Sequence, residues 1–146
     1  MNTQQIDKLL ENQPKFKGTF PCDVIPIITE PDYSIIVNTD NSSSPGSHWT
    51  VITFKGDNVY YFDSFGRNYD NKSFPEDYTL NLSKLFLGKR IKFQNKVLQG
   101  FHTNTCAEYC IFFVKQFHRN VPFSNICNDF TENLNLNDSK IMKLYK

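Results

Sequence analysis

The sequence predicts an α+β fold, in which a small mixed or antiparallel sheet packs on one central buried helix. Three observations predict it. Short segments rich in β-branched and aromatic residues recur between residues 34 and 62 and indicate strands. Residues 105–118 are apolar nearly all round, which is typical of a helix buried at the centre of a domain. Strands and helices do not alternate as repeating units, which argues against a parallel α/β sheet.

Length and composition indicate one globular domain, residues 1–146. The chain has 146 residues, within the ~100–150 common for single domains, and no repeat or linker divides it. Although only 39% of the residues are hydrophobic, 22 are aromatic (14 Phe, 7 Tyr and 1 Trp), and each can bury a large apolar area. This content excludes disorder. The net charge of +1 provides no global field that would attract nucleic acid or an anionic membrane.

The first 47 residues predict one helix and one strand. A cap candidate, Thr3, precedes apolar residues at helical spacing, so a short helix is expected to begin there and to end near Pro14. Residues 17–31 contain one glycine and three prolines and are expected to be extended or turn-like. Residues 34–37 predict a β-branched strand, and residues 38–47 predict a polar loop.

The middle of the chain predicts a β-hairpin followed by a helix. Residues 48–54 and 58–62 are expected to form two strands joined through Lys55-Gly-Asp57. Residues 63–75 include glycine and proline and are expected to form a loop. Residues 76–87 place apolar side chains at helical spacing before a glycine, which predicts a surface helix.

The last third of the chain predicts a strand, the buried helix and a polar tail. Residues 90–99 alternate well enough between apolar and polar positions to predict a strand. The helix over residues 105–118 follows. From Asn128 onward the apolar residues are sparse, so the tail predicts one or two weak helices.

Four residues carry the chemistry that the sequence predicts. His48 opens a strand, Asp63 directly follows the next strand, Gln99 ends a strand and Cys106 begins the buried helix. A thiol becomes a good nucleophile once it is deprotonated, and the free N–H groups and partial positive charge at a helix N-terminus favour the thiolate. Cys106 follows two cap candidates and is therefore the predicted nucleophile.

The other three residues fit supporting roles. His48 would pair with the thiolate and donate a proton to the leaving amine. Asp63 would bind the second imidazole nitrogen and fix its tautomer, because adjacent antiparallel strands can place the two side chains together. The backbone N–H of Cys106 and the side-chain amide of Gln99 would stabilise the tetrahedral oxyanion.

These motifs resemble the adenovirus proteinase (adenain) family of cysteine proteases, and especially its relatives in virophages, large DNA viruses and transposons. The resemblance covers roughly residues 16–117. The order His, acid, Gln, Cys distinguishes it from papain-type enzymes, in which the cysteine precedes the histidine. The matching stretches are Phe16-Lys-Gly-Thr-Phe-Pro21, Ile35-Ile-Val-Asn-Thr39, Gly46-Ser-His-Trp49, Tyr61-Phe-Asp-Ser-Phe-Gly66 and Gln99-Gly to Cys106-Ala-Glu-Tyr-Cys110.

The resemblance implies an adenain/Ulp-like cysteine peptidase fold and a function. His48, Asp63, Gln99 and Cys106 take the roles of base, orienting acid, oxyanion donor and nucleophile, with Asp63 standing where adenain has Glu. The implied activity is that of a viral cysteine endopeptidase, which cleaves precursor proteins of the capsid near glycine residues during virion maturation.

The resemblance also sets expectations about partners and location. A disulfide-linked peptide and DNA activate the adenovirus enzyme, but the position of its peptide-binding cysteine falls near Gly88, so that disulfide is not expected, and any other activating peptide is unknown. With a net charge of +1, nucleic acid is expected to bind weakly at most. The longest apolar run, residues 110–114, is shorter than the ~20 residues of a membrane helix. We expect a monomer without membrane contact.

The expected location is the virion and the infected host cell, in the cytoplasm or the viral factory. No signal peptide is visible, so we expect that the chain is not secreted. The four cysteines are therefore expected to be free thiols in a reducing compartment, and three of them, Cys22, Cys110 and Cys127, are interpreted as packing residues.

Two other functions stay open. Isopeptidases specific for SUMO or ubiquitin share the order His, Asp, Gln, Cys and cleave after Gly-Gly, but the stretches 16–21 and 36–39 favour the adenain side. A binding module with inactive chemistry is the second alternative, and the presence of all four site residues argues against it.

Each site residue also has a structural alternative. His48 could form a structural pair with Trp49, Asp63 could be a turn residue, Gln99 an ordinary strand-end residue and Cys106 a small buried apolar residue. His102, Cys106 and Cys110 have a spacing that could place metal ligands on one helix, but the intervening Thr-Asn-Thr is typical of a cap and no fourth ligand is evident. We therefore expect neither a metal nor a cofactor.

Overall fold

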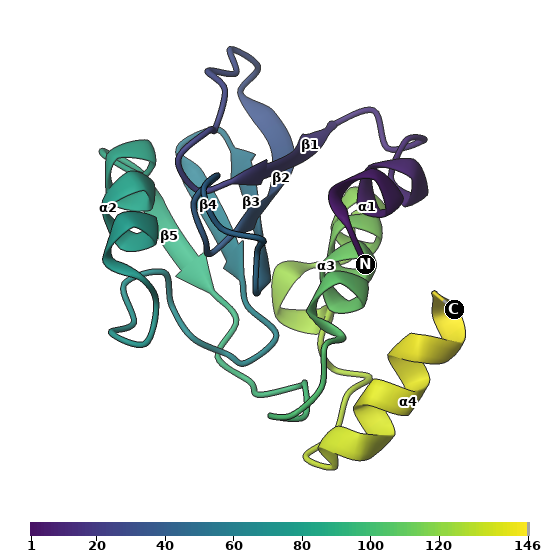
Figure 1. Cartoon of the computed structure of the whole chain (residues 1–146). Coiled ribbons are helices and arrows are strands. Elements are labelled where there is room, and N and C mark those ends of the chain that lie inside the picture. The colour runs from purple at the N-terminus through teal and green to yellow at the C-terminus, as the bar shows by residue number, and fades with distance from the viewer. Residues whose placement is uncertain (146) are drawn as a thin grey trace.

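A computed structural model describes residues 1–145 as a five-stranded mixed sheet between helices (Figure 1). The strands lie in chain order, β1 to β5; the two outer pairs are parallel and the two inner pairs antiparallel. The α+β prediction, with a small mixed sheet, is confirmed. The elements are α1 (Thr3–Leu9), β1 (Phe16–Pro21), β2 (Asp32–Asn38), β3 (Trp49–Lys55), β4 (Asn58–Phe62), α2 (Glu76–Leu85), β5 (Arg90–Phe93), α3 (Cys106–His118), a 3-10 turn (Phe123–Asn125) and α4 (Leu134–Leu144).

The sheet is covered on both faces, which explains why its central strands are buried along most of their length. Alternate residues of β2 point to opposite faces, with Ile36 toward α3 and α1, and Ile35 and Val37 toward α2. Figure 1 shows α2 on one side of the sheet and α3 on the other. Nearly every β2 side chain is therefore buried, a pattern more typical of strands covered by helices on both faces than of a half-exposed antiparallel sheet.

The central helix forms as predicted. In α3 the first nine residues, Cys106–Val114, are all buried, so no face of this stretch meets solvent. Phe113 stacks on Phe62 of the sheet at 4.7 Å between ring centroids. The first turn of α3, which begins at Cys106, is therefore enclosed by the rest of the protein.

One strand was not predicted as such, and one predicted strand ends early, in both cases because of contacts made in the folded protein. The stretch 17–31, expected to be extended or turn-like, begins with β1, which pairs in parallel with β2 and shifts register around Gly18 at a φ of +126°. The strand expected over residues 90–99 ends at Phe93, because the side chain of Gln94 bonds both the backbone N–H and the carbonyl of Lys96 and turns the chain. Gln99 therefore lies in a loop.

The termini add two helices. The N-cap of α1 is Asn2, one residue before the predicted Thr3, in a reciprocal pair of hydrogen bonds with Gln5. The polar tail forms α4, anchored by the buried Ile141 and by two buried polar residues, Asn137 and Asp138. Over residues 1–145, no helix combines the length and apolar character needed to cross a membrane.

Candidate active site

The hairpin of β3 and β4 brings His48 and Asp63 to the same end of the sheet. Val51 pairs with Phe62 in the antiparallel register, so the residues before β3 and after β4 leave the sheet side by side. His48 directly precedes β3 and Asp63 directly follows β4, and both side chains are buried. The structure therefore places these two predicted site residues together.

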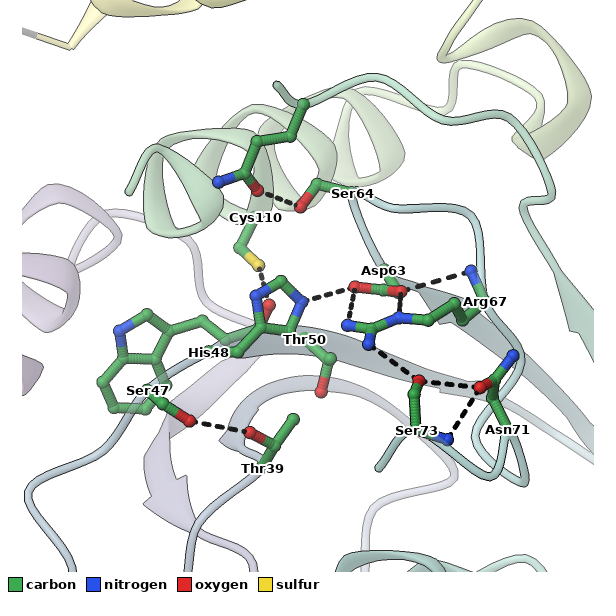
Figure 2. A network of polar contacts seen from close by, with 12 residues as sticks. Thr39, Ser47, His48, Thr50, Asp63, Ser64, Arg67, Asn71, Ser73 and Cys110 are labelled. Carbon is green, nitrogen blue, oxygen red and sulfur yellow. Dashed lines mark hydrogen bonds and ion pairs between the residues drawn. The ribbon is translucent and has the colours of Figure 1, made fainter. Parts of the chain in front are cut away.

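His48 is held as a charged imidazolium. Its Nε2 donates a hydrogen bond to Asp63 Oδ1 (Figure 2). Burial, the largest influence, lowers the pKa of His48, but the hydrogen bond and charge of Asp63, together with the neighbouring Cys106 side chain, outweigh burial and raise this pKa to about 9. The ring therefore carries a proton at neutral pH. Since Nε2 faces Asp63, Nδ1 is the nitrogen left for Cys106.

A second cation, Arg67, holds the other oxygen of Asp63. Arg67 donates to Asp63 Oδ2 from Nε at 2.7 Å and from its backbone N–H at 3.2 Å (Figure 2). Its guanidinium donates to Ser73 Oγ at 3.0 Å and lies 4.1 Å from the ring centroid of Phe74. Burial raises the pKa of Asp63, but the hydrogen bonds and charges of His48 and Arg67 have a larger opposite effect. The pKa of Asp63 is therefore lowered, and the carboxylate stays ionised. Sequence reasoning missed Arg67, whose only signal was an arginine within the predicted loop.

Asp63 also begins a turn, so the two interpretations of this residue are compatible. Its carbonyl accepts from the backbone N–H of Gly66 at 2.8 Å while its carboxylate binds His48 and Arg67. Gly66 has a φ of +73°, and a Cβ there would lie 2.8 Å from backbone atoms of Asn95 and Lys96. The turn therefore packs tightly against the loop that carries Gln99.

The side-chain amide of Gln99 is fixed at both ends. Its Oε1 accepts from Ser64 Oγ at 2.6 Å, while its Nε2 donates to the carbonyl of Thr103 at 3.0 Å and contacts the Thr103 hydroxyl at 3.3 Å. Gln99 is nearly fully buried. Both acceptors of Gln99 Nε2 belong to Thr103. One N–H of this amide would therefore have to give up its contact with Thr103 before it could donate to a substrate oxyanion. Sequence reasoning missed Ser64, although it directly follows Asp63.

Cys106 is the first residue of α3 and is 6% exposed. The predicted cap works differently: Thr105 occupies the N-cap position, but its side chain makes no capping hydrogen bond to the helix. The helix start therefore keeps backbone N–H groups free of a side-chain cap, next to the sulfur. Such groups favour an anion at this point.

The other three cysteines are buried, as their interpretation as packing residues predicted. Burial raises the pKa of the Cys22 thiol to about 11 and that of Cys127 to about 12. Burial also raises the pKa of Cys110 well above its usual value, and its Sγ–H donates to the carbonyl of Trp49 at 3.3 Å. Thiols that keep their protons are poor nucleophiles.

Two aromatic rings extend from the histidine to the surface. Phe65 stacks on His48 at 5.3 Å, and Phe101 stacks on Phe65 at 6.0 Å with the rings nearly parallel. Phe101 is 70% exposed and borders a cavity of about 480 Å³ that is also lined by Val97 and Leu134. Neither ring was predicted from the sequence to belong to the site. The stack therefore connects the buried imidazole, through Phe65, to an exposed apolar ring at the surface.

The arrangement does not form a metal site among the described residues. His102 precedes α3, whereas Cys106 and Cys110 lie on it, so the three do not share one helix. Over residues 1–145, no cluster of three or more His, Cys, Asp or Glu side chains is placed to hold a metal ion.

Known structures share this fold. The crystal structure of ASFV pS273R protease aligns with a TM-score of 0.57 at 16% identity, covering 96% of this chain and 65% of that chain. The Se-Met form of the ASFV protease gives a TM-score of 0.56 at 15% identity, covering 97% and 66%. The central domain of the uncharacterized Lpg1148 protein from Legionella pneumophila gives 0.51 at 11% identity, covering 99% and 95%.

No protein-family model matches the chain, and no curated protein matches it either. The chain spans less than two thirds of the length of the viral protease that it resembles. At these identities the likeness concerns the fold alone. The chain therefore has the α+β fold of a viral protease, with a buried His–Asp pair at the end of its hairpin and a cysteine at the start of its central helix.

Proposed function

We propose that the chain is a viral cysteine endopeptidase with Cys106 as nucleophile, His48 as acid and base, and Asp63 as the group that orients His48. One observation carries the proposal. The buried His48 ring donates from Nε2 to Asp63 Oδ1, Asp63 and the neighbouring Cys106 raise its pKa to about 9 despite burial, and Cys106 begins α3. This arrangement favours a thiolate–imidazolium pair.

The reaction follows from these positions. The Cys106 thiolate attacks the peptide carbonyl carbon, a C–S bond forms, and the carbonyl electron pair moves to the oxygen. Free N–H groups at the start of α3 and the amide of Gln99 would stabilise this oxyanion. When it collapses, the C–N bond breaks and His48 gives its proton to the leaving amine. Water then attacks the thioester while His48 takes a proton from it, and the acid product leaves with the thiolate restored.

The finer proposal is an adenain-like role in virion maturation. Its support is the set of adenain-like stretches around the site and the fold shared with a viral protease. The substrates would be precursor proteins of the capsid cut near glycine residues, and the enzyme would act as a monomer in the virion and the infected cell.

The purified chain incubated with the capsid proteins of its own genome tests the substrate. New termini identified by mass spectrometry should lie beside glycine residues and be absent with Cys106→Ala. A parallel incubation with SUMO and ubiquitin fusions tests the isopeptidase alternative. Cleavage after Gly-Gly of these fusions, with intact capsid proteins, would favour that alternative. Rapid labelling of Cys106 by iodoacetamide at neutral pH, compared with Cys110, would argue against a module with inactive chemistry.

The pH dependence of peptide cleavage should report the charge of His48. Because its pKa is raised to about 9, the imidazolium is present below that pH, and kcat/KM should fall as pH rises through about 9. Asp63→Asn removes a negative partner that raises this pKa, so the alkaline limb should move to lower pH. Profiles of kcat/KM for both proteins measure the shift, and coincident alkaline limbs would contradict the assignment.

Gln99→Ala should lower kcat with little change in KM. An oxyanion donor acts more strongly on the transition state than on the bound substrate, and losing one costs ~10²–10³ in turnover. Alkylation by iodoacetamide forms no tetrahedral oxyanion, so the labelling rate of Cys106 should stay near that of the wild type. Peptide cleavage at the wild-type rate in Gln99→Ala would remove Gln99 from the oxyanion site.

A further inference from the structure

A buried carboxylate on α4, Asp138, binds the segment that joins Gln99 to Cys106. Asp138 Oδ2 accepts from the backbone N–H of Gly100 at 3.0 Å. Its Oδ1 accepts from the hydroxyl of Thr105 at 3.0 Å. Gly100 directly follows Gln99, and Thr105 directly precedes Cys106. One side chain therefore holds both ends of the loop between two predicted site residues.

The third partner of Asp138 anchors it to the central helix. Tyr109 on α3 donates its hydroxyl to Asp138 Oδ1 at 2.7 Å. Burial, followed by the hydrogen bond and charge of Asp138, raises the pKa of Tyr109, so the hydroxyl keeps its proton and stays a donor. Asn137, the neighbour of Asp138, donates its side-chain amide to the carbonyl of Leu98 at 3.1 Å. Two consecutive residues of α4 thus hydrogen-bond to residues in and next to the 99–106 loop.

The burial of Asp138 is unusual for a carboxylate. It is 8% exposed, and within residues 1–145 it forms no ion pair. Carboxylates are seldom buried without a cation, because removal from water is costly, and here three neutral donors take the place of a cation. All three donors lie on the loop or on the first turn of α3, so the site is built around this loop.

The loop is shaped to accept the carboxylate. A Cβ added to Gly100 would lie 2.8 Å from Asp138 Oδ2, closer than side chains approach one another. Any other residue at this position would displace either the loop or the carboxylate. The glycine that follows Gln99 is therefore explained by the approach of α4.

We propose that Asp138 is a positioning residue of the active site, which acts from the C-terminal helix by fixing the 99–106 loop so that the Gln99 amide and the Cys106 sulfur face the same substrate carbonyl. The inference rests on the proposed peptidase function. It makes α4 a working part of the active site, although no residue of α4 touches the reacting atoms.

Asp138→Asn tests the proposal with a change of one atom. If the new amide keeps its oxygen toward Thr105 and Tyr109, its NH₂ group faces the N–H of Gly100, and the two donors repel. The loop should then shift, and kcat should fall about 10²-fold, the loss expected when a reacting group is misplaced by about 1 Å. KM and the rate of Cys106 alkylation should stay close to the wild-type values, because the His48–Asp63 pair is untouched.

Ile141→Val is the matched control. Ile141 is fully buried on the same helix and does not contact the 99–106 loop by hydrogen bonding, so its truncation loosens α4 without changing the carboxylate. It should lower the melting temperature and leave kcat unchanged. Gly100→Ala places a Cβ too close to Asp138 Oδ2 and so disrupts the same contact through a change in the loop. It should reproduce the kinetics of Asp138→Asn.

Two further measurements separate the outcomes. In a Gln99→Ala background, Asp138→Asn should cost much less than it does alone, because both changes remove the same donor. Amide hydrogen exchange at Gly100 should be slow in the wild type and fast in Asp138→Asn. Wild-type kcat in Asp138→Asn, or an equal loss in Ile141→Val, would overturn the proposal. If the wild type cleaves no peptide, the peptidase proposal fails, whereas exchange at Gly100 still decides whether Asp138 holds the loop.

Discussion

Cys106→Ala should abolish peptide cleavage while the protein stays folded. Alanine is the best helix former and fits the first position of α3, and the change removes only one sulfur atom. No other described cysteine can replace it, since burial raises the pKa of Cys22, Cys110 and Cys127. Cleavage of a fluorogenic peptide and the thermal unfolding curve of the same preparation measure both effects.

Cys110→Ala is the matched control, one helical turn further along. Its thiol is fully buried and donates to the carbonyl of Trp49, so its loss should lower stability by about 1 kcal/mol, the amount typical for deleting one buried atom. Activity should remain. Cys106→Ala should therefore be the more stable but inactive variant, and Cys110→Ala the less stable but active one. Equal loss of activity in two folded variants would remove Cys106 from its assigned role.

Asp63→Asn should produce the second largest loss of activity. The amide keeps the shape of the carboxylate, and its oxygen can still accept from Arg67, but it no longer carries the charge that stabilises the imidazolium of His48. The corresponding change in a serine triad costs ~10⁴ in turnover. We expect a smaller loss here, because the proposed Cys106 thiolate would supply part of that stabilising charge.

Asp70→Asn is the control for this variant, because Asp70 is an exposed aspartate in the same loop. It should cleave peptide at the wild-type rate. Asp63→Asn should also unfold at a lower temperature, since the charge of Arg67 would be left in a partly buried place without its carboxylate. An unchanged rate in Asp63→Asn would mean that Asp63 serves only as the first residue of its turn.

Local patterns in the sequence predicted the elements that depend on short-range contacts. The hairpin of β3 and β4 was predictable because its turn lies between two runs of aromatic and β-branched residues. The helix α3 was predictable because its residues are apolar all round. The contact of His48 with Asp63 followed from the hairpin, since antiparallel strands joined by a short turn bring their far ends together.

Elements that depend on distant segments were predicted less well. β1 contains Gly18 and Pro21, which locally indicate a turn, and it is a strand because it pairs in parallel with β2. The stretch from residue 90 alternates like a longer strand, but Gln94 turns the chain by bonding to Lys96 and by donating to the distant carbonyl of Asp63. In both cases a contact made in the folded protein outweighs the local preference of the segment.

By itself, the sequence determined the α+β class, the central helix and which side chains could form a thiol site, because periodicity and hairpin signals act within a few residues along the chain. The tertiary structure decided how these side chains are held. Arg67 reaches Asp63 through the shape of a loop, Ser64 orients Gln99 across 35 residues, and Asp138 grips Gly100 across 38. None of these hydrogen bonds leaves a period in the sequence, since only the packed fold brings the partners within about 3 Å of one another.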